Sequence, residues 1–165
     1  MPVNSDSFKH ALGRFASGVT IVTTADGEKL AGLTVSAFSS VSLDPPYVLV
    51  CINKQSSAIE PLRSSKVFAV NMLSDEQVAV SNLFANPRVD KFAEAQYRMG
   101  QLNIPILEGC LAHLECSLVQ EVDAGDHYVY LGQVEEAQVD ETKRPLLYYR
   151  GRYEMLEAVQ TESNP

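Results

Sequence analysis

Strand-like segments separated by turn signals run along most of this 165-residue chain, and they decide its fold class. Residues 19–24 (VTIVTT) are all β-branched, and β-branched side chains favour strands. The Asp26-Gly27 pair that follows is a two-residue turn signal, so residues 19–25 and 28–37 are predicted to form a β-hairpin. Further strands are predicted at residues 47–53, 66–73, 111–122, 128–139 and 145–155.

Short helices are predicted beside the strands. Residues 5–16 carry apolar side chains at helical spacing after a capping residue, Asn4 or Ser5. Capping-box spacing predicts two more helices, over residues 57–64 and 74–85. A doubly wound parallel sheet would need helices alternating with strands, and the second half does not supply them. The pattern therefore predicts a mainly β fold, a closed antiparallel barrel with a few flanking short helices.

Two segments depart from simple alternation. Residues 47–53 form a continuous apolar run, which predicts a strand buried on both faces. Residues 88–108 are irregular, and a connection of this length is typical of a functional loop or an interface arm.

Composition and charge narrow the range of partners. The net charge is −8, and hydrophobic residues make up 45% of the chain. An acidic chain lacks the positive field on which binding to nucleic acid or to an anionic membrane depends, so neither partner is expected. The length fits one domain over residues 1–165, with enough apolar residues for a core.

The N-terminus and the cysteines indicate a compartment. No cationic start followed by an apolar core is present at the N-terminus, and no apolar run reaches the length of a membrane span, so a cytoplasmic protein is expected. Cys51, Cys110 and Cys116 are an odd number without CxxC spacing. They predict buried free thiols rather than a disulfide framework, and no metal site is expected.

Residues 31–53 hold a run of small hydroxyl side chains between two apolar segments. Five hydroxyl residues lie before the turn at Asp44: Thr34, Ser36, Ser39, Ser40 and Ser42. One interpretation is a solvent-facing strand edge. The other is a platform for a flat, uncharged heteroaromatic ring, whose polar edge needs short fixed donors and acceptors rather than charge.

Two other segments are candidates for binding phosphate. Residues 51–57 end a strand and lead into a helix start, where free amide groups attract anions, although an ordinary helix cap explains the same residues. Arg88 and Lys91 lie between Phe84 and Phe92, and two neighbouring cations in an acidic chain can form a phosphate pocket. A solvated loop is the alternative for that segment.

His127 lies in a Gly125-Asp126-His127 turn between two long predicted strands. A histidine there can bond a substrate amide or donate a proton near neutral pH, and an idle exposed side chain is the alternative. The sequence has no GxGxxG, GxSxG or HExxH motif, so the usual Rossmann, hydrolase and metalloprotease signatures are absent.

Taken in order, these motifs resemble the flavin reductase-like family, the short-chain reductase components of two-component flavin monooxygenases. The resemblance covers residues 8–156 and rests on five stretches, RFASGVT (14–20), GLTVSAFSSVS (32–42) with the prolines at 45–46, FAVN (68–71), Arg88 to Phe92, and GDH (125–127). It implies an FMN-binding split barrel, a homodimer, and reduction of FMN or FAD by NADH or NADPH, with NADH favoured. A separate monooxygenase would receive the reduced flavin.

The resemblance also implies roles for individual residues. Thr34, Val35, Ser36, Ala37 and Ser40 would line the isoalloxazine ring. Cys51, Ile52, Asn53, Ser56 and Ser57 would follow the ribityl chain and phosphate, with Arg88 and Lys91 as phosphate partners and Phe84 and Phe92 packed nearby. His127 would be the catalytic-site residue beside the nicotinamide, and Tyr149 and Arg150 would be further nicotinamide or interface contacts.

Two other functions fit the same sequence. One is a flavin-binding carrier or sensor on this fold that does not turn over NADH. The other is a β-barrel interaction module that binds no flavin. Binding of flavin would distinguish the reductase and the carrier from the interaction module. Flavin-dependent oxidation of NADH would distinguish the reductase from the carrier.

Overall fold

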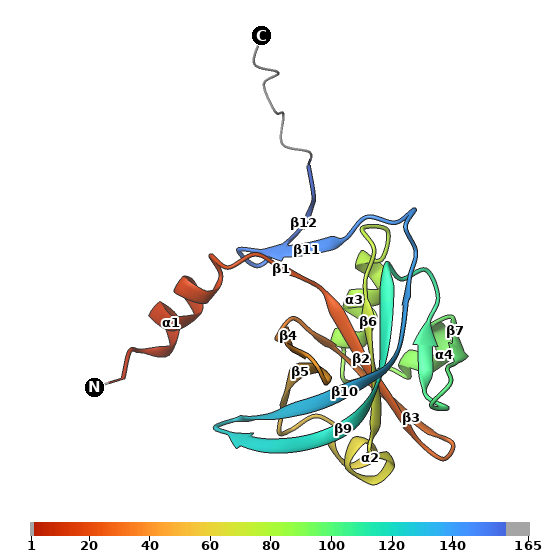
Figure 1. Ribbon diagram of the computed structural model, residues 1–165. Coiled ribbons are helices and arrows are strands. Elements are labelled where there is room, and N and C mark those ends of the chain that lie inside the picture. Colours follow the sequence, from red (N-terminus) through yellow and green to blue (C-terminus); the bar gives the residue numbers. More distant parts are fainter. Residues whose placement is uncertain (1, 158–165) are drawn as a thin grey trace.

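The computed structural model describes residues 2–157, and strands dominate it (Figure 1). Seven antiparallel strands form the central sheet, in the order β3-β2-β6-β9-β10-β5-β4. These strands are β2 (Thr20–Asp26), β3 (Lys29–Val35), β4 (Phe38–Leu43), β5 (Pro46–Asn53), β6 (Val67–Met72), β9 (Ala112–Ala124) and β10 (His127–Val139). The prediction of a mainly β fold is therefore confirmed.

Smaller elements flank the central sheet. The second sheet contains β1 (Ser17–Gly18), β11 (Leu146–Tyr149) and β12 (Arg152–Met155), and a two-stranded ladder joins β7 (Tyr97–Met99) to β8 (Pro105–Leu107). The helices are α1 (Ser5–Leu12), α2 (Ile59–Ser65), α3 (Val78–Ala85) and α4 (Lys91–Glu94). Figure 1 shows α1 extending away from the body of the molecule.

The predicted hairpin of residues 19–37 is present as β2 and β3, paired from Thr20 with Val35 to Asp26 with Lys29. Gly27 has a φ of 60° at the first turn position, a conformation that glycine adopts without steric strain. The long predicted strands at 111–122 and 128–139 are confirmed by β9 and β10, which pair with each other along most of their length.

The central sheet does not close into a ring through backbone hydrogen bonds. β3 and β4 are the two edge strands of this sheet among the described residues. The prediction of a closed barrel is therefore wrong for the backbone hydrogen bonding of the sheet. Only Ser36 and Ala37 link the two strands, and the chain continues from them to pair with β5 instead of folding back on β3. The Cys51 N–H of β5 donates to the Ala37 carbonyl oxygen at 3.0 Å and holds this corner in place.

α1 is shorter and less buried than its sequence predicts. Asn4 is its cap, because its side-chain oxygen accepts from the Ser7 N–H at 2.8 Å, and the helix ends at Leu12 instead of residue 16. Its apolar side chains are not covered by the body of the molecule: Phe8 is 53% exposed and Leu12 55% exposed. The predicted stripe exists, but it has no partner within the described residues.

The two predicted capping boxes form only in part. α2 begins at Ile59, and the Ser56 hydroxyl, not that of Ser57, accepts from the Ala58 N–H. Before α3, the Gln77 side-chain oxygen accepts from the Ser74 N–H at 2.9 Å, which is one half of the expected pair. The Ser74 hydroxyl donates to the Gly109 carbonyl instead, so a long-range contact replaces the local cap.

Three further predictions are corrected. β5 alternates between buried and partly exposed residues, so the described part of the chain covers only one of its faces fully. Residues 88–108 are not irregular, since they contain α4 and the β7–β8 hairpin. Residues 145–155 hold two strands instead of one, because the chain reverses at Arg150-Gly151.

The core lies inside the curled central sheet and under α2 and α3. The largest fully buried side chains include Tyr130, Phe68, Phe84 and Ile52. Cys51, Cys110 and Cys116 are free thiols, and burial raises the pKa of Cys110 to about 11. Among the described residues no helix has both the length and the apolar character to cross a membrane.

Candidate functional site

Three sequence-predicted stretches meet at one end of β5. His127 of β10 is the register partner of Asn53, while on the other side of β5 the Cys51 N–H bonds the Ala37 carbonyl. Ser36-Ala37, Cys51–Asn53 and His127 therefore lie on three neighbouring strand ends. We call these residues the β5 rim. Residues far apart in the sequence come together here because β5 pairs with β10 on one side and β4 on the other.

His127 is held in a defined orientation at this rim. Its Nδ1 lies 2.7 Å from Asp126 Oδ1, and this hydrogen bond lowers the pKa of the Asp126 carboxyl. The Asp126 carbonyl accepts from the Lys54 N–H, which fixes the turn against the end of β5. The His127 side chain is 41% exposed, so its ring remains accessible to a ligand. A carboxylate on Nδ1 favours the tautomer whose Nε2 accepts a hydrogen bond.

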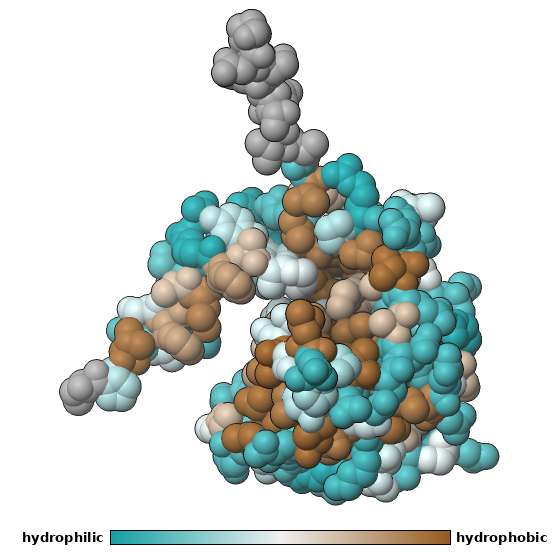
Figure 2. Space-filling model, in the orientation of Figure 1, coloured by the Kyte–Doolittle hydropathy of each residue, from teal (hydrophilic) through white to brown (hydrophobic). Residues whose placement is uncertain are grey.

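A cavity of about 430 Å³ adjoins the rim between the end of α1, the β3–β4 corner and the β11–β12 turn. We call it the corner cavity. Its lining comprises Leu12, Gly13, Phe15, Ser17, Ser36, Ala37, Phe38, Tyr148, Tyr149, Arg150 and Gly151. Figure 2 shows apolar side chains on α1 and on the body of the molecule, on either side of the open space between them.

The hydroxyl-rich stretch does not act as one surface. The Thr34 hydroxyl donates to the Ser81 carbonyl of α3 at 2.7 Å, and Val35 is buried in the core. Ser36 and Ala37 are exposed and line the corner cavity, whereas Ser40 is exposed on the edge strand β4. The stretch thus divides between the two interpretations, with only its corner residues at the cavity.

The β5–α2 segment offers a mixed set of groups. Ile52 is fully buried, so only its backbone can meet a ligand, and burial raises the pKa of the Cys51 thiol. Asn53 and Ser57 are exposed, while Ser56 caps the turn before α2. Exposed donors are therefore present beside the β5 rim.

The Phe84–Phe92 segment lies against β3 and α3. Lys91 Nζ donates to the Gly32 carbonyl at 2.7 Å, and burial lowers the pKa of its ammonium group. Phe84 is buried against Gly32, and Phe92 packs edge-on to it at 5.4 Å between ring centroids. Arg88 is exposed. Within residues 2–157 no hydrogen bond or ion pair joins Arg88 or Lys91 to the serines of the β5–α2 segment.

The cavity also contains residues that the sequence did not single out for a site. Leu12, Phe15 and Tyr148 supply most of its apolar lining, while Tyr149 and Arg150 were expected contacts. The sequence signal that could have indicated this cavity is the pair of adjacent tyrosines before the Arg150-Gly151 turn. The cavity forms because this turn contacts Gly13 at the end of α1, and local sequence patterns do not predict such a long-range contact.

The fold is that of a class of flavin-reducing enzymes. The structure aligns with the NADH:FAD oxidoreductase of Streptomyces globisporus, solved in complex with NAD and FAD fragments, at a TM-score of 0.90 and 31% identity, covering 98% of this chain and 99% of that one. Residues 12–157 match the family model described as the flavin reductase like domain. The chain belongs to this family.

Curated relatives agree with that assignment. The chain is 40% identical over 158 residues to the reductase subunit of a flavin-dependent monooxygenase from Rhodococcus jostii, a match that covers 96% of this chain and 81% of the relative. It is 42% identical over 156 residues to an NADH-dependent flavin reductase from a Rhodococcus species, covering 90% of this chain and 85% of the relative.

Proposed function

We propose that this protein is an NADH-dependent flavin reductase that reduces FMN or FAD and supplies the reduced flavin to a separate monooxygenase. One observation carries the proposal: β5 brings together the stretches to which the family resemblance gives flavin and nicotinamide contacts, next to a cavity of suitable size. The activities named for the relatives, an NADH-dependent flavin reductase and a monooxygenase reductase subunit, support it.

The corner cavity suits a flavin ring. Phe15 and Tyr148 offer apolar surface, Ser36 offers a hydroxyl, and the volume lies in the usual range for small-ligand sites. A flavin bound there would supply the ring that accepts a hydride from the nicotinamide. The chain's own task is then to hold the two rings face to face, so no residue is required as an acid or base for the transfer itself.

We propose the same residue roles that the resemblance implies. The isoalloxazine contacts are Thr34, Val35, Ser36, Ala37 and Ser40, and the ribityl and phosphate contacts are Cys51, Ile52, Asn53, Ser56, Ser57, Arg88 and Lys91, with Phe84 and Phe92 packed behind them. Exposure supports Ser36, Ala37 and Asn53 directly. Buried Val35 and Ile52 would contribute backbone groups, and Lys91 would exchange its bond to Gly32 for one to phosphate.

His127 is proposed to orient the nicotinamide. Its exposed ring lies at the rim, and its bond to Asp126 leaves Nε2 free to accept from an amide N–H. NADPH is the second candidate reductant, because the binding of a 2′-phosphate depends on arginine contacts that the family assignment does not define.

The finer features of the fold are also proposals. β3 and β4 share the Ser36-Ala37 corner but have no ladder between them, which supports a split barrel.

Exposed apolar side chains on α1 and on β4, including Leu43 at 95% exposure, support a homodimer. We propose one domain over residues 1–165, of which residue 1 and residues 158–165 lie outside the described part. Three free thiols fit a cytoplasmic location.

A turnover assay tests the function. NADH oxidation by the purified protein should require added FMN or FAD, and the reduced flavin formed should support hydroxylation by a monooxygenase added separately. Flavin binding, followed by fluorescence quenching, without NADH oxidation would favour the carrier or sensor. Absence of both flavin binding and turnover would leave the interaction module.

A further inference from the structure

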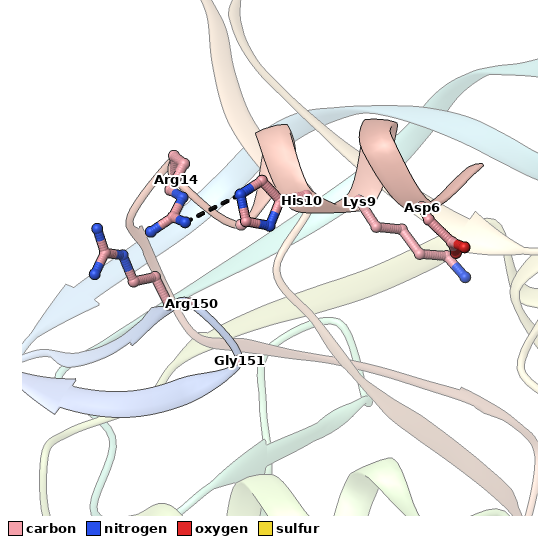
Figure 3. Close-up of a pocket in the computed structure, with 7 residues that line it drawn as sticks. Asp6, Lys9, His10, Arg14, Arg150 and Gly151 are labelled. Carbon is pink, nitrogen blue, oxygen red and sulfur yellow. Dashed lines mark hydrogen bonds between the residues drawn. The ribbon is translucent and has the colours of Figure 1, made fainter. Parts of the chain in front are cut away.

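A second pocket, of about 460 Å³, lies between α1 and the β11–β12 turn (Figure 3). Four of its lining side chains are basic, Lys9, His10, Arg14 and Arg150, and Asp6 supplies one carboxylate. Figure 3 shows His10, Arg14 and Arg150 grouped at one end, while Lys9 extends toward Asp6. We call this the basic pocket.

The cations of this pocket outnumber its one carboxylate, and they form no ion pair within the described part of the chain. Arg14 Nη2 lies 3.1 Å from His10 Nε2, and a guanidinium has only donors, so the imidazole nitrogen accepts. No carboxylate within residues 2–157 forms an ion pair with Lys9, Arg14 or Arg150. In a chain with a net charge of −8, such a local group of cations favours binding of an anion.

The helix C-terminus explains only part of this cluster. Lys9 lies in the last turn of α1, where a cation stabilises the helix dipole. Arg150 comes from the β11–β12 turn, more than a hundred residues further along the chain, and its N–H donates to the Gly13 carbonyl at 3.0 Å. The tertiary structure therefore adds a cation that the helix does not need.

Arg150 also occupies an unfavourable backbone conformation. Its φ is 53° and that of Gly151 is 74°, so the two residues form a turn with both central positions in the left-handed region. Asn, Asp or Gly is preferred at the first of these positions, and a long side chain is disfavoured. An arginine at a position where asparagine would fit better points to a role for the guanidinium.

The basic pocket adjoins the corner cavity. Both are lined by Gly13, Arg150 and Gly151. A ligand whose ring lies in the corner cavity can therefore extend a charged group directly into the basic pocket. Arginine suits phosphate oxygens because its planar guanidinium donates two parallel hydrogen bonds.

We propose that the basic pocket binds the diphosphate of NADH, with Arg14 and Arg150 as its phosphate-binding residues; this rests on the proposed function. The nicotinamide would lie face to face with the flavin ring at the corner cavity, and the diphosphate would cross Gly13 into the basic pocket. The flavin phosphate is assigned to a different region, around Ser56, Ser57, Arg88 and Lys91. The pocket thus contributes affinity for the reductant and not for FMN.

Calorimetric titration with ADP-ribose tests the pocket without chemistry, because ADP-ribose carries the diphosphate but neither nicotinamide nor flavin. Arg14→Gln and Arg150→Asn should each weaken ADP-ribose binding by about tenfold, the loss expected for one charge-assisted contact. Arg150→Asn suits the left-handed turn, so a folding defect is not expected. Arg98→Gln, which removes one charge outside both pockets, is the matched control and should bind ADP-ribose as the unaltered protein does.

Steady-state kinetics distinguish NADH from FAD as the dinucleotide whose diphosphate the basic pocket binds. With FMN as the flavin, the two pocket variants should raise the KM for NADH by about tenfold with little change in kcat, while FMN affinity by fluorescence stays the same. Unchanged ADP-ribose affinity and KM for NADH in both variants would overturn the proposal. Weaker FAD binding with unchanged NADH kinetics would also overturn it, by assigning the pocket to the diphosphate of FAD. If the unaltered protein oxidises no NADH, the proposed function fails, and the ADP-ribose titration still decides the pocket.

Discussion

Two histidines on the central sheet have opposite environments, and they show how position decides the role of a residue. His127 lies at the β5 rim with an exposed ring bonded to Asp126. His113 of β9 is 7% exposed, and its Nε2 has no hydrogen-bond partner in the structure. The first is available to a ligand, while the second affects stability.

Replacement of His127 by alanine should impair use of NADH more than binding of flavin. Loss of one hydrogen bond to the nicotinamide amide predicts a KM for NADH higher by about 3- to 10-fold. Steady-state NADH oxidation measures this, and fluorescence quenching checks that flavin affinity is retained. Asp126→Asn keeps the imidazole and should have a smaller effect. Unchanged NADH kinetics in His127→Ala would exclude the orienting role.

His113 should make the protein less stable as the pH falls. Burial, and secondarily Arg98, lower the pKa of its imidazole below 6.5, while Glu115, Glu136 and Glu108 act weakly in the other direction. The unfolded chain therefore binds the proton at a higher pH than the folded chain does. Stability is complete above about pH 6.5 and decreases below it, with a slope of up to about 1.4 kcal/mol per pH unit from this group.

Urea unfolding of His113→Gln and of the unaltered protein at pH 7.5 and 5.5 measures this contribution. The difference in unfolding free energy between the two pH values should be smaller in the variant, because glutamine does not titrate. Equal pH dependence in both proteins would show that His113 binds the same number of protons in the folded and in the unfolded chain, and would contradict this prediction.

At the scale of elements, a close approach between side chains explains why a glycine is needed at a position that belongs to no sequence motif. β10 pairs with β9 in the central sheet, and at Gly132 an added Cβ would lie 2.5 Å from Phe68 Cζ of β6 and 3.0 Å from Cys116 Cβ of β9. Phe68 is fully buried, so its ring cannot move away without disturbing the core. The absence of a side chain at Gly132 allows the sheet to curl around Phe68.

Gly132→Ala should therefore destabilise the fold by about 1–3 kcal/mol, as overpacking of a core does. Gly18→Ala is the matched control, because nothing lies within 4 Å of an added Cβ there, and its effect should stay within about 0.5 kcal/mol. Chemical denaturation of both variants measures the two values. A cost for Gly132→Ala no larger than that for Gly18→Ala would contradict the packing argument.

At the scale of the whole molecule, the apolar face of α1 is not covered by the described part of the chain. Phe8 and Leu12 of the helix and Phe15 just after it are exposed, whereas the basic pocket is lined by the polar residues Asp6, Lys9 and His10 of the same helix. Val41 and Leu43 on edge strand β4 are exposed as well. A second copy of the chain would bury these side chains, in agreement with the proposed homodimer.

The combined change Phe8→Ser and Leu12→Ser should convert a dimer into a monomer of 18.1 kDa, because it removes the apolar contact without altering the core. Light scattering after size-exclusion chromatography measures the mass. Lys9→Ser, on the opposite face of α1, should leave the dimer intact. A monomeric unaltered protein, or a dimer that survives the double change, would exclude α1 as the interface.

Local patterns predicted most of the elements. The Asp26-Gly27 turn and the β-branched run before it define the first hairpin, and the alternation along β9 and β10 defines the long one. Such signals act between neighbours in the sequence, so they can be recognised without a structure. The β7–β8 hairpin escaped prediction because β8 is a short buried segment that shows no alternation.

The mainly β fold, the hairpin turns and the motifs that place the chain in its family were predictable without a structure, because they depend on residue type and short-range spacing. The folded chain was needed to show that β5 joins Ala37, Asn53 and His127 at one rim, that the Thr34 hydroxyl bonds the Ser81 carbonyl of α3, and that Arg14 and Arg150 line one basic pocket. These contacts link residues far apart along the chain. They follow from the strand order and from the contact between the β11–β12 turn and Gly13 after α1, and both depend on the packing of the whole chain.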